Sequence, residues 1–343
     1  MDYCPCQDKR INEKLVSCSL CDRKWHLRCA RQQGTPESRF ECAICILHDQ
    51  DPMHHVIDKL FTATFLNNGT KYQFRLSHEI MQNVQRNPSL FIEIRILKFD
   101  GINTYETTWP DKGSLKFNDV FLKEFKPLAV NSSIKKRKDE KLTIRENFKQ
   151  SSYADNTLQI FFENVFDNKN TKIGDDPKYF FGIYLIQKLT VEELSQNILR
   201  DATWSQQQSK EFIAGLFKQD TEGGIEVSEI KLDPLCCILS TPVKLPSRGK
   251  SCNHSNCFSL LAFLESMNSN LTRKWCCPIC KKKCYNIIYD QYVDAIINSI
   301  DYSDDNIMTD IILEKNGEYQ IIRTNFDGDS NSKPGIYEGY CNG

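Results

Sequence analysis

Two short stretches, SCNHSNCF at Ser251–Phe258 and WCCPIC at Trp275–Cys280, carry the spacing of metal ligands. Zinc in a structural site takes four cysteine or histidine ligands in a tetrahedron. A finger with two zinc ions therefore needs eight ligands, but this part of the chain offers one clear set of four. The stretches thus predict either a finger built around a single ion or a two-ion finger that has lost one site.

Cysteine is concentrated near the two ends of this 343-residue chain. Of 16 cysteines, seven lie between Cys4 and Cys45 and eight between Cys236 and Cys284. The first ten residues, MDYCPCQDKR, contain no hydrophobic signal core, and no apolar run approaches the length of a membrane span. We therefore expect an intracellular protein, in which clustered cysteines beside histidines indicate zinc sites rather than disulfides.

The overall charge is close to zero, with 44 basic and 45 acidic side chains. This balance argues against binding nucleic acid through overall charge. No helical DNA-binding segment precedes Cys4, so we expect no direct DNA binding and no membrane association.

The first fifty residues contain eight potential ligands in four close pairs, enough for two tetrahedral zinc sites. The pairs are Cys4 with Cys6, Cys18 with Cys21, His26 with Cys29, and Cys42 with Cys45. A segment this short and this poor in apolar residues cannot bury a sufficient core, so metal binding should supply much of its folding free energy.

Histidine is the fifth ligand of this series, an order that resembles a PHD finger rather than a RING finger. The resemblance implies interleaved sites, with Cys4, Cys6, His26 and Cys29 on one ion and Cys18, Cys21, Cys42 and Cys45 on the other. Trp25 and Phe40 match buried aromatic positions of that family. PHD fingers often bind histone tails, and some enclose methyl-lysine in an aromatic cage.

Lys24 occupies the position of the usual cage tryptophan, and its charge would repel a trimethyl-ammonium group. Recognition of an unmodified tail and a purely structural finger both stay open for this segment.

The middle of the chain, from about residue 56 to 199, is rich in strand signals. FIEIRILKF at residues 91–99 alternates, with three isoleucines on one face and Glu93 and Arg95 on the other. We expect a β-sandwich or an open barrel. Thr190 and Glu193 form a capping-box pattern that starts a helix, and a second helix is expected over residues 204–217. The segment contains no catalytic constellation.

KLTIRENFKQSSYADNTLQIFFE at residues 141–163, followed by YFFGIYLIQKLT at 179–190, is similar to the PINIT domain of Siz and PIAS proteins. That resemblance implies a role in selecting substrates and positioning the loaded conjugating enzyme. The basic run KKRK at residues 135–138 fits either a nuclear-import signal or a solvated loop.

The second cysteine cluster resembles the SP-RING (Miz-type) finger of SUMO ligases. The similarity covers residues 231–285 and includes LCCILSTPVKLPSRGKSCNHSNCF, a helical SLLAFLESM and RKWCCPIC. It implies one zinc ion held by Cys252, His254, Cys277 and Cys280. Two ligands of the missing site survive as Cys236 and Cys257, whereas Leu239 and Leu260 stand in place of the other two. The finger is therefore a one-zinc finger, and Cys237, Cys276 and Cys284 are extra thiols without an assigned role.

The resemblance implies an E3 SUMO-protein ligase of the Siz/PIAS family, which has no nucleophile of its own. Such a ligase binds the SUMO-loaded conjugating enzyme through an apolar groove, and Ile238, Pro278 and Ile279 match or adjoin the contact positions. Expected partners in the nucleus are the conjugating enzyme, SUMO and protein substrates, and a histone tail is a candidate partner of the PHD-type finger. Two alternatives are a chromatin adaptor without ligase activity and a ubiquitin ligase; the missing zinc site and the PINIT-like segment disfavour the latter.

The expected fold is a multidomain α+β chain with three zinc ions. Its segments are a PHD-type finger at 1–50, a PINIT-like domain at 55–200, a helical linker at 201–224, an SP-RING at 225–285, an SP-RING C-terminal extension at 286–325 and a disordered tail at 326–343.

Overall fold

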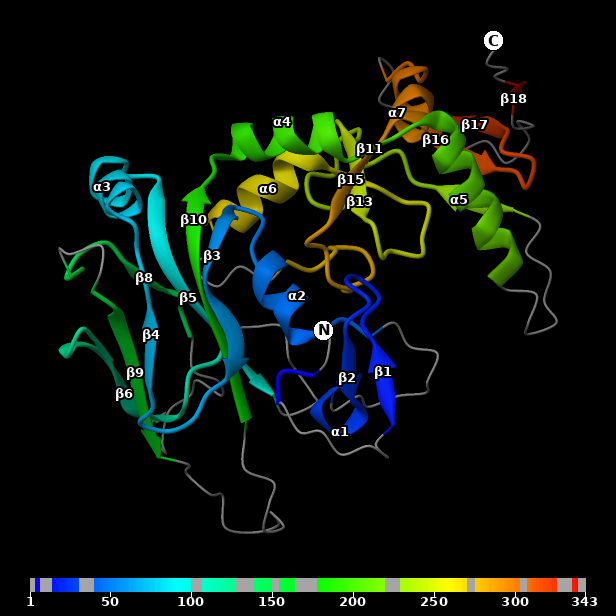
Figure 1. Ribbon diagram of the computed structural model, residues 1–343. Helices are drawn as coiled ribbons and strands as arrows, with labels where there is room; N and C mark the ends of the chain where they lie inside the picture. The colour runs from blue at the N-terminus through cyan, green and yellow to red at the C-terminus, as the bar shows by residue number, and fades with distance from the viewer. Residues whose placement is uncertain are drawn as a thin grey trace. The chain divides into compact units, whose positions relative to one another are not determined.

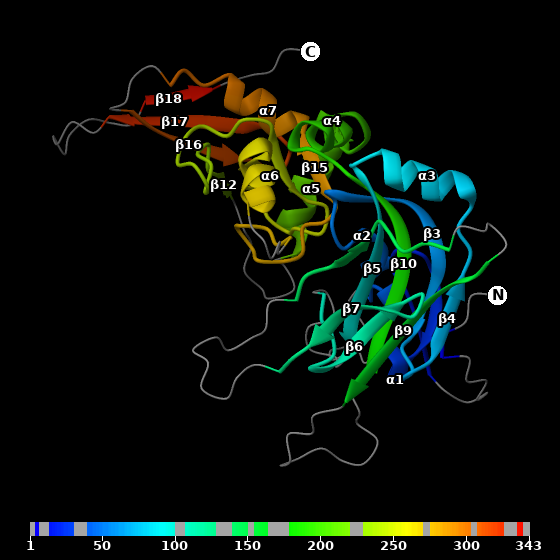
Figure 2. The ribbon, with the colours of Figure 1, turned by 90° about the vertical axis from the view of Figure 1, so that its left-hand side faces the viewer.

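The computed structural model divides the chain into two compact units, Met1–Leu189 and Thr190–Gly343. Both units mix helices and strands (Figures 1 and 2), so the expected α+β class is confirmed at that level. The structure describes residues 4–6, 14–30, 40–99, 107–127, 139–149, 154–163, 178–219, 229–269, 275–302, 307–325 and 335–338. The KKRK run lies outside these ranges. In the parts so described, no helix is long and apolar enough to cross a membrane.

The first unit begins with a small segment that carries eight of the potential zinc ligands; we call residues 4–50 the finger segment. Strands β1 (Leu15–Ser17) and β2 (Lys24–His26) pair antiparallel, with Val16 opposite Trp25. Helix α1 (Leu27–Ala30) follows directly, and α2 (Ala43–Asp49) starts after Cys42.

Two four-stranded sheets form the rest of the first unit. One has the order β3-β10-β5-β8 and the other β4-β9-β6-β7, and every pairing is antiparallel. The strands are β3 (His54–Phe65), β4 (Lys71–Phe74), β5 (Leu90–Phe99), β6 (Lys112–Phe117), β7 (Val120–Phe125), β8 (Leu142–Ile144), β9 (Asn156–Glu163) and β10 (Lys178–Lys188). Helix α3 (His78–Arg86) begins at Ser77, whose hydroxyl accepts a hydrogen bond from the Ile80 amide.

The two sheets enclose one apolar core. Ile92, Ile94 and Ile96 of β5 enter it, as the alternation in FIEIRILKF predicts, and meet side chains of β4, β6 and β9. We call these two sheets the sandwich.

The opposite face of β5 is buried as well. Glu93 and Arg95 alternate with the isoleucines, yet both are completely buried. The reason is a third layer: α2 packs on β3, β5 and β10 (Figure 1), so this face of the sheet is turned toward the finger segment and not toward water. The finger segment and the sandwich consequently share a second core, which includes Trp25, Phe40 and Phe180.

The second unit surrounds the other cysteine cluster. It contains α4 (Val191–Asp201), β11 (Thr203–Trp204), α5 (Gln206–Gln219), β12 (Ile230–Leu232), β13 (Pro246–Gly249), β14 (Phe258–Ser259), α6 (Leu260–Ser269), β15 (Ile287–Asp290), α7 (Gln291–Asn298), β16 (Ile307–Leu313), β17 (Tyr319–Asn325) and β18 (Gly335–Glu338). Its sheets have the orders β11-β15-β13-β14 and β12-β16-β17-β18. The capping box of α4 is present, because Thr190 accepts from the Glu193 amide while the Glu193 carboxylate accepts from the Thr190 amide.

Helices α4 and α5 are integrated into this unit. Helix α4 packs on α6, α5 packs on α7, and β11 between them adds a parallel strand to β15. Most of the predicted helical linker at 201–224 is regular structure, because β11 and α5 lie within it.

The predicted C-terminal extension begins with β15 and then α7, because the β-branched Ile287 and Ile288 pair with β13 and Asp290 caps the helix. Within the predicted disordered tail, residues 335–338 form β18, where Ile336 and Tyr337 lie opposite Ile322 and Ile321 of β17.

Candidate metal centres and docking loops

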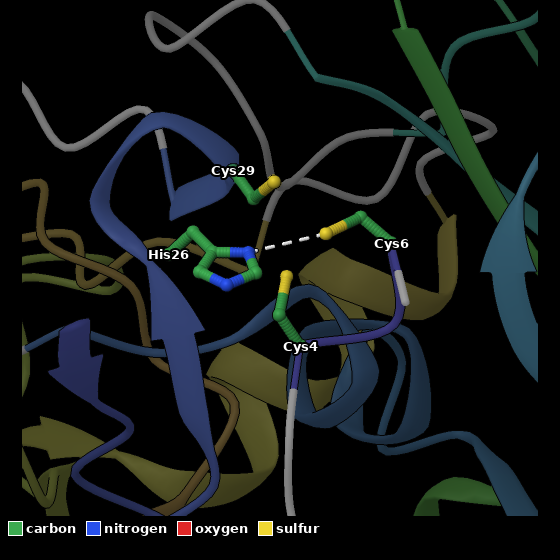
Figure 3. Close-up of side chains that lie close together, drawn as sticks. All are labelled: Cys4, Cys6, His26 and Cys29. Atoms are coloured by element: carbon green, nitrogen blue, oxygen red, sulfur yellow. Dashed lines mark hydrogen bonds between the residues drawn. The ribbon is translucent and has the colours of Figure 1, made fainter. Parts of the chain in front are cut away.

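The first cluster brings together Cys4, Cys6, His26 and Cys29 (Figure 3). Their ligand atoms all lie within 4.8 Å of one another, and Cys6 Sγ is 3.2 Å from His26 Nδ1. His26 lies at the end of β2 and Cys29 lies in α1, so the cluster joins the β1–β2 hairpin and the helix after it to Cys4 and Cys6 near the N-terminus.

The second cluster consists of Cys18, Cys21, Cys42 and Cys45. Cys18 Sγ lies 4.0 Å from Cys45 Sγ, and Cys21 Sγ lies 3.7 Å from Cys42 Sγ. The amides of Leu20 and Cys42 donate to Cys18 Sγ at 3.4 and 3.2 Å, which stabilises negative charge on that sulfur. Cys21 is exposed, whereas Cys18 and Cys42 are buried.

The third cluster, in the second unit, contains Cys252, His254, Cys277 and Cys280. Cys280 Sγ is 3.6 Å from Cys252 Sγ, and Cys277 Sγ is 3.4 Å from His254 Nε2. The other ring nitrogen, His254 Nδ1, lies 2.9 Å from the carbonyl oxygen of Asn256. A hydrogen bond there places the proton on Nδ1 and leaves Nε2 free as a metal ligand.

The chemistry of all three clusters fits zinc. Each offers four sulfur or nitrogen donors, and zinc requires its cysteine ligands as thiolates. The hydrogen bond between Cys252 and Cys277 lowers the pKa of Cys277 to about 3 and raises the pKa of Cys252. The hydrogen bond between Cys4 and Cys29 likewise lowers the pKa of Cys4 to about 5 and raises the pKa of Cys29. Zinc binding would release the protons that these pairs hold, and the four donors of each group can hold one ion, three ions in all.

Three loops share one backbone pattern around a cysteine. The amides of Cys18, Cys236 and Cys277 each donate to the carbonyl five residues ahead, at 3.0, 2.8 and 2.7 Å. The residue four positions ahead donates back to the cysteine carbonyl and has a φ of 55°, 55° and 61° respectively. This tight turn orients two ligands three residues apart in the loops from Cys18 and Cys277. The loop from Cys236 has the same turn, but its second ligand position holds Leu239.

Hydrogen bonds and packing take the place of an ion in this loop. The Ser259 amide donates to Cys236 Sγ at 3.3 Å, and Leu260 is completely buried. Burial raises the pKa of the buried Cys257 thiol to about 12, and its nearest charges are Arg248 and Asp290. Among the described residues, Cys236 and Cys257 belong to no group of atoms able to hold a metal.

A buried ion pair ties the third cluster to the helices around it. Arg248 pairs with Asp290, and its other terminal nitrogen donates to the His254 carbonyl at 2.9 Å. The guanidinium lies 4.9 Å from the Phe212 ring centre, and Asp290 accepts from Ser209 of α5 while it caps α7. Sequence patterns do not reveal this pair, because its members are 42 residues apart and neither belongs to a motif.

Two loops, residues 235–242 and 276–283, expose apolar side chains beside the third cluster. Ile238 in the first and Pro278 and Ile279 in the second are half-buried. The thiol of Cys237 lies close enough to Cys277 and Lys281 for their charges to act on its pKa, which burial raises. The two loops are therefore neighbours.

Two further leucines of the first loop were not singled out from the sequence as contact residues. Leu239 is 54% exposed and Leu235 is 44% exposed. Leu239 stands at the vacated ligand position, so its spacing from Cys236 was the available signal.

The match to a known family covers this part of the chain. The MIZ/SP-RING zinc finger family model matches residues 232–283, which contain the third cluster and both loops. E3 SUMO-protein ligase PIAS2 of Rattus norvegicus is 21% identical over 268 residues, 72% of this chain. The chain is thus similar to Siz and PIAS proteins, and its residues 232–283 match the MIZ/SP-RING zinc finger family.

Other relatives match shorter parts of this chain. E3 SUMO-protein ligase SIZ1 of Saccharomyces cerevisiae is 27% identical over 118 residues, which is 34% of this chain and 13% of the relative. Zinc finger MIZ domain-containing protein 1 of Homo sapiens is 35% identical over 85 residues, 24% of this chain and 8% of the relative. The S. cerevisiae SUMO E3 ligase SIZ2 crystal structure aligns at 18% identity and a TM-score of 0.43, covering 79% of this chain and 98% of that one. The chain spans 45% of rat PIAS2, less than half its length.

Proposed function

We propose that this protein is a member of the Siz/PIAS family and acts as an E3 SUMO-protein ligase. The observation that carries the proposal is the pair of loops beside the third cluster, which hold apolar side chains on rigid turns within the MIZ/SP-RING match. A conjugating enzyme charged with SUMO docks on Ile238, Pro278 and Ile279, and the exposed Leu239 widens that surface.

The ligase acts by positioning and forms no covalent intermediate with SUMO. It holds the thioester between SUMO and the conjugating enzyme in an orientation that a substrate lysine can attack. Ideal positioning of two reactants lowers a barrier by ~7–11 kcal/mol, and a flexibly tethered donor gains less. Zinc at the third cluster would act through structure, since Cys252, His254, Cys277 and Cys280 fix the second loop and need not touch the reacting atoms.

The finer layout is part of the same proposal. Residues 1–50 are a PHD-type finger, 55–200 a PINIT-like domain that selects substrate, 225–285 the SP-RING and 286–325 its C-terminal extension. In the finger, exposed Lys24 lies opposite Ser17 on the outer face of the β1–β2 hairpin. Because a cation stands there in place of the usual cage tryptophan, this face suits an unmodified histone tail better than trimethyl-lysine. We place the protein in the nucleus.

A single-turnover discharge experiment tests the proposal. The conjugating enzyme is loaded with SUMO, the full chain and a lysine acceptor are added, and loss of the thioester is followed. Ile238→Ala should abolish the acceleration. Ile57→Ala makes the same substitution at a residue of β3 that is 48% exposed, and it should leave the acceleration unchanged because Ile57 belongs to the other unit. A conjugating enzyme loaded with ubiquitin serves as the control for specificity.

Acceleration with SUMO alone, lost in Ile238→Ala, is the expected result. Acceleration of ubiquitin discharge instead would point to a ubiquitin ligase. A zinc-loaded protein that accelerates neither reaction would refute ligase activity and favour a chromatin adaptor.

A further inference from the structure

The finger segment is joined to the sandwich by a fully buried arginine. Arg95 of β5 donates from Nη1 to the carbonyl oxygens of Leu47 and His48 at 2.8 and 2.7 Å. These are carbonyls of the last turn of α2, which a helix leaves without partners of its own. Nη2 of Arg95 donates to the His54 carbonyl at 2.7 Å, so one side chain binds the end of α2 and the start of β3.

The charges around Arg95 are compensated within the same junction. Arg95 Nε donates to Glu93 at 2.6 Å, and His54 Nδ1 lies 2.5 Å from the second Glu93 oxygen. Lys141 pairs with Asp51 at 2.8 Å. Burial raises the pKa of Glu93, but the charges of Lys141 and Arg95 outweigh it and bring the pKa to about 2. Three segments of the chain thus meet in one ionic network.

An apolar contact completes the junction. The Trp25 ring centre lies 5.6 Å from Phe180 of β10 and 6.5 Å from Phe65 of β3, and Trp25 has no exposed surface. Ile46 and Leu47 of α2 enter the same cluster. The finger segment therefore has no complete core without the sheet, and the sheet buries aromatic and charged side chains that only this segment covers.

We infer that the finger segment is a zinc-dependent layer of the first unit, so that zinc at Cys18, Cys21, Cys42 and Cys45 holds sheet β3-β10-β5-β8 in its folded state. The two ends of α2 give the physical reason. Cys42 and Cys45 fix its start, and Arg95 binds its end. Without the ion, the free energy that orders this short segment is lost, and the buried face of the sheet would meet water.

This inference concerns folding and stands apart from ligase activity. It is tested first with Cys42→Ser in the full chain, using hydrogen exchange with mass spectrometry. Cys280→Ser removes a ligand of the third cluster in the other unit and serves as the matched control. In Cys42→Ser the amides of β5 and β10 should exchange at least about tenfold faster, while Cys280→Ser leaves them unchanged. Unchanged β5 and β10 amides in Cys42→Ser would overturn the inference.

A reciprocal experiment covers the case in which Cys42→Ser does not fold. Coupling between two sites is mutual, so weakening the sheet side should weaken zinc retention. Phe180→Leu and Phe181→Leu, made in the Cys280→Ser background, remove the same group from adjacent residues. Phe180 contacts Trp25, whereas Phe181 stacks on Phe61 inside the sandwich.

The readout of this experiment is the rate at which a chromogenic chelator takes up zinc. Phe180→Leu should release zinc several times faster than Phe181→Leu. Equal rates in both variants and in the Cys280→Ser parent would show that the finger segment keeps its zinc independently of the sheet, which contradicts the inference.

Discussion

Replacing Arg95 with methionine should destabilise the first unit severely. Methionine keeps much of the volume but removes the guanidinium that is hydrogen-bonded to the buried Glu93 carboxylate, and three carbonyl oxygens lose their donor. Removing one partner of a buried ion pair costs about 3–5 kcal/mol. Since domains are stable by about 5–15 kcal/mol, this loss takes a large share of the total.

Lys112→Met provides the matched control for Arg95→Met. Lys112 pairs with Glu163 at 2.7 Å, but the two side chains are 53% and 67% exposed. Exposed pairs contribute roughly 0–1 kcal/mol, so this variant should differ little from the unsubstituted chain. The contrast therefore separates burial from the mere presence of an ion pair.

The assay is the denaturant dependence of hydrogen exchange in β5 and β9, with zinc in excess. These strands belong to different sheets of the first unit, so a loss in both reports unfolding of the whole sandwich. A cost below about 1 kcal/mol in Arg95→Met, or one equal to that of Lys112→Met, would refute the assignment of Arg95 as the link between α2 and the sheet.

Three other outcomes are expected. The pKa of Glu93 is about 2 in the folded chain, below its usual value of 4.5, so the ionised carboxylate stabilises the fold fully above pH 4.5 and loses this effect as pH falls toward 2. The difference in unfolding free energy between the unsubstituted chain and Glu93→Gln should therefore stay constant from about pH 6 to 9, which denaturation at several pH values will show. Cys236→Ala should retain three zinc ions by native mass spectrometry, and Cys252→Ala only two; equal counts would contradict the one-ion finger. Asp290→Asn removes the charge that pairs with Arg248 and should lower the unfolding free energy of the second unit alone by about 3 kcal/mol or more. The temperature dependence of hydrogen exchange in α7 measures this loss.

The metal centres could be predicted almost entirely from the sequence. Ligands three residues apart are placed by one local turn, so Cys18 with Cys21 and Cys277 with Cys280 are visible as spacing alone. The interleaved grouping followed from the family resemblance, and the structure brings the same three sets of four together. The α4 capping box is equally local and was predicted from Thr190 and Glu193.

The layer that covers β5 could not be predicted in this way. Alternation in FIEIRILKF says that two faces differ, but not what lies against the second face. Glu93 and Arg95 look like solvent-facing residues until α2, nearly fifty positions earlier in the chain, is placed on them. Arg248 and Asp290 were missed for the same reason, because only the tertiary fold brings them together.

The contact between Trp25 and Phe180 also constrains the order in which the protein can mature on the ribosome. Phe180 is synthesised 155 residues after Trp25. At about 5–20 residues per second, the nascent finger segment waits on the order of 10 s before β10 emerges. During that interval the cysteine and histidine ligands of the finger segment can already bind metal, but the Trp25 indole has no β10 to pack against. Metal capture by the finger segment can therefore precede its docking on the sheet by the time that translation of the intervening residues takes.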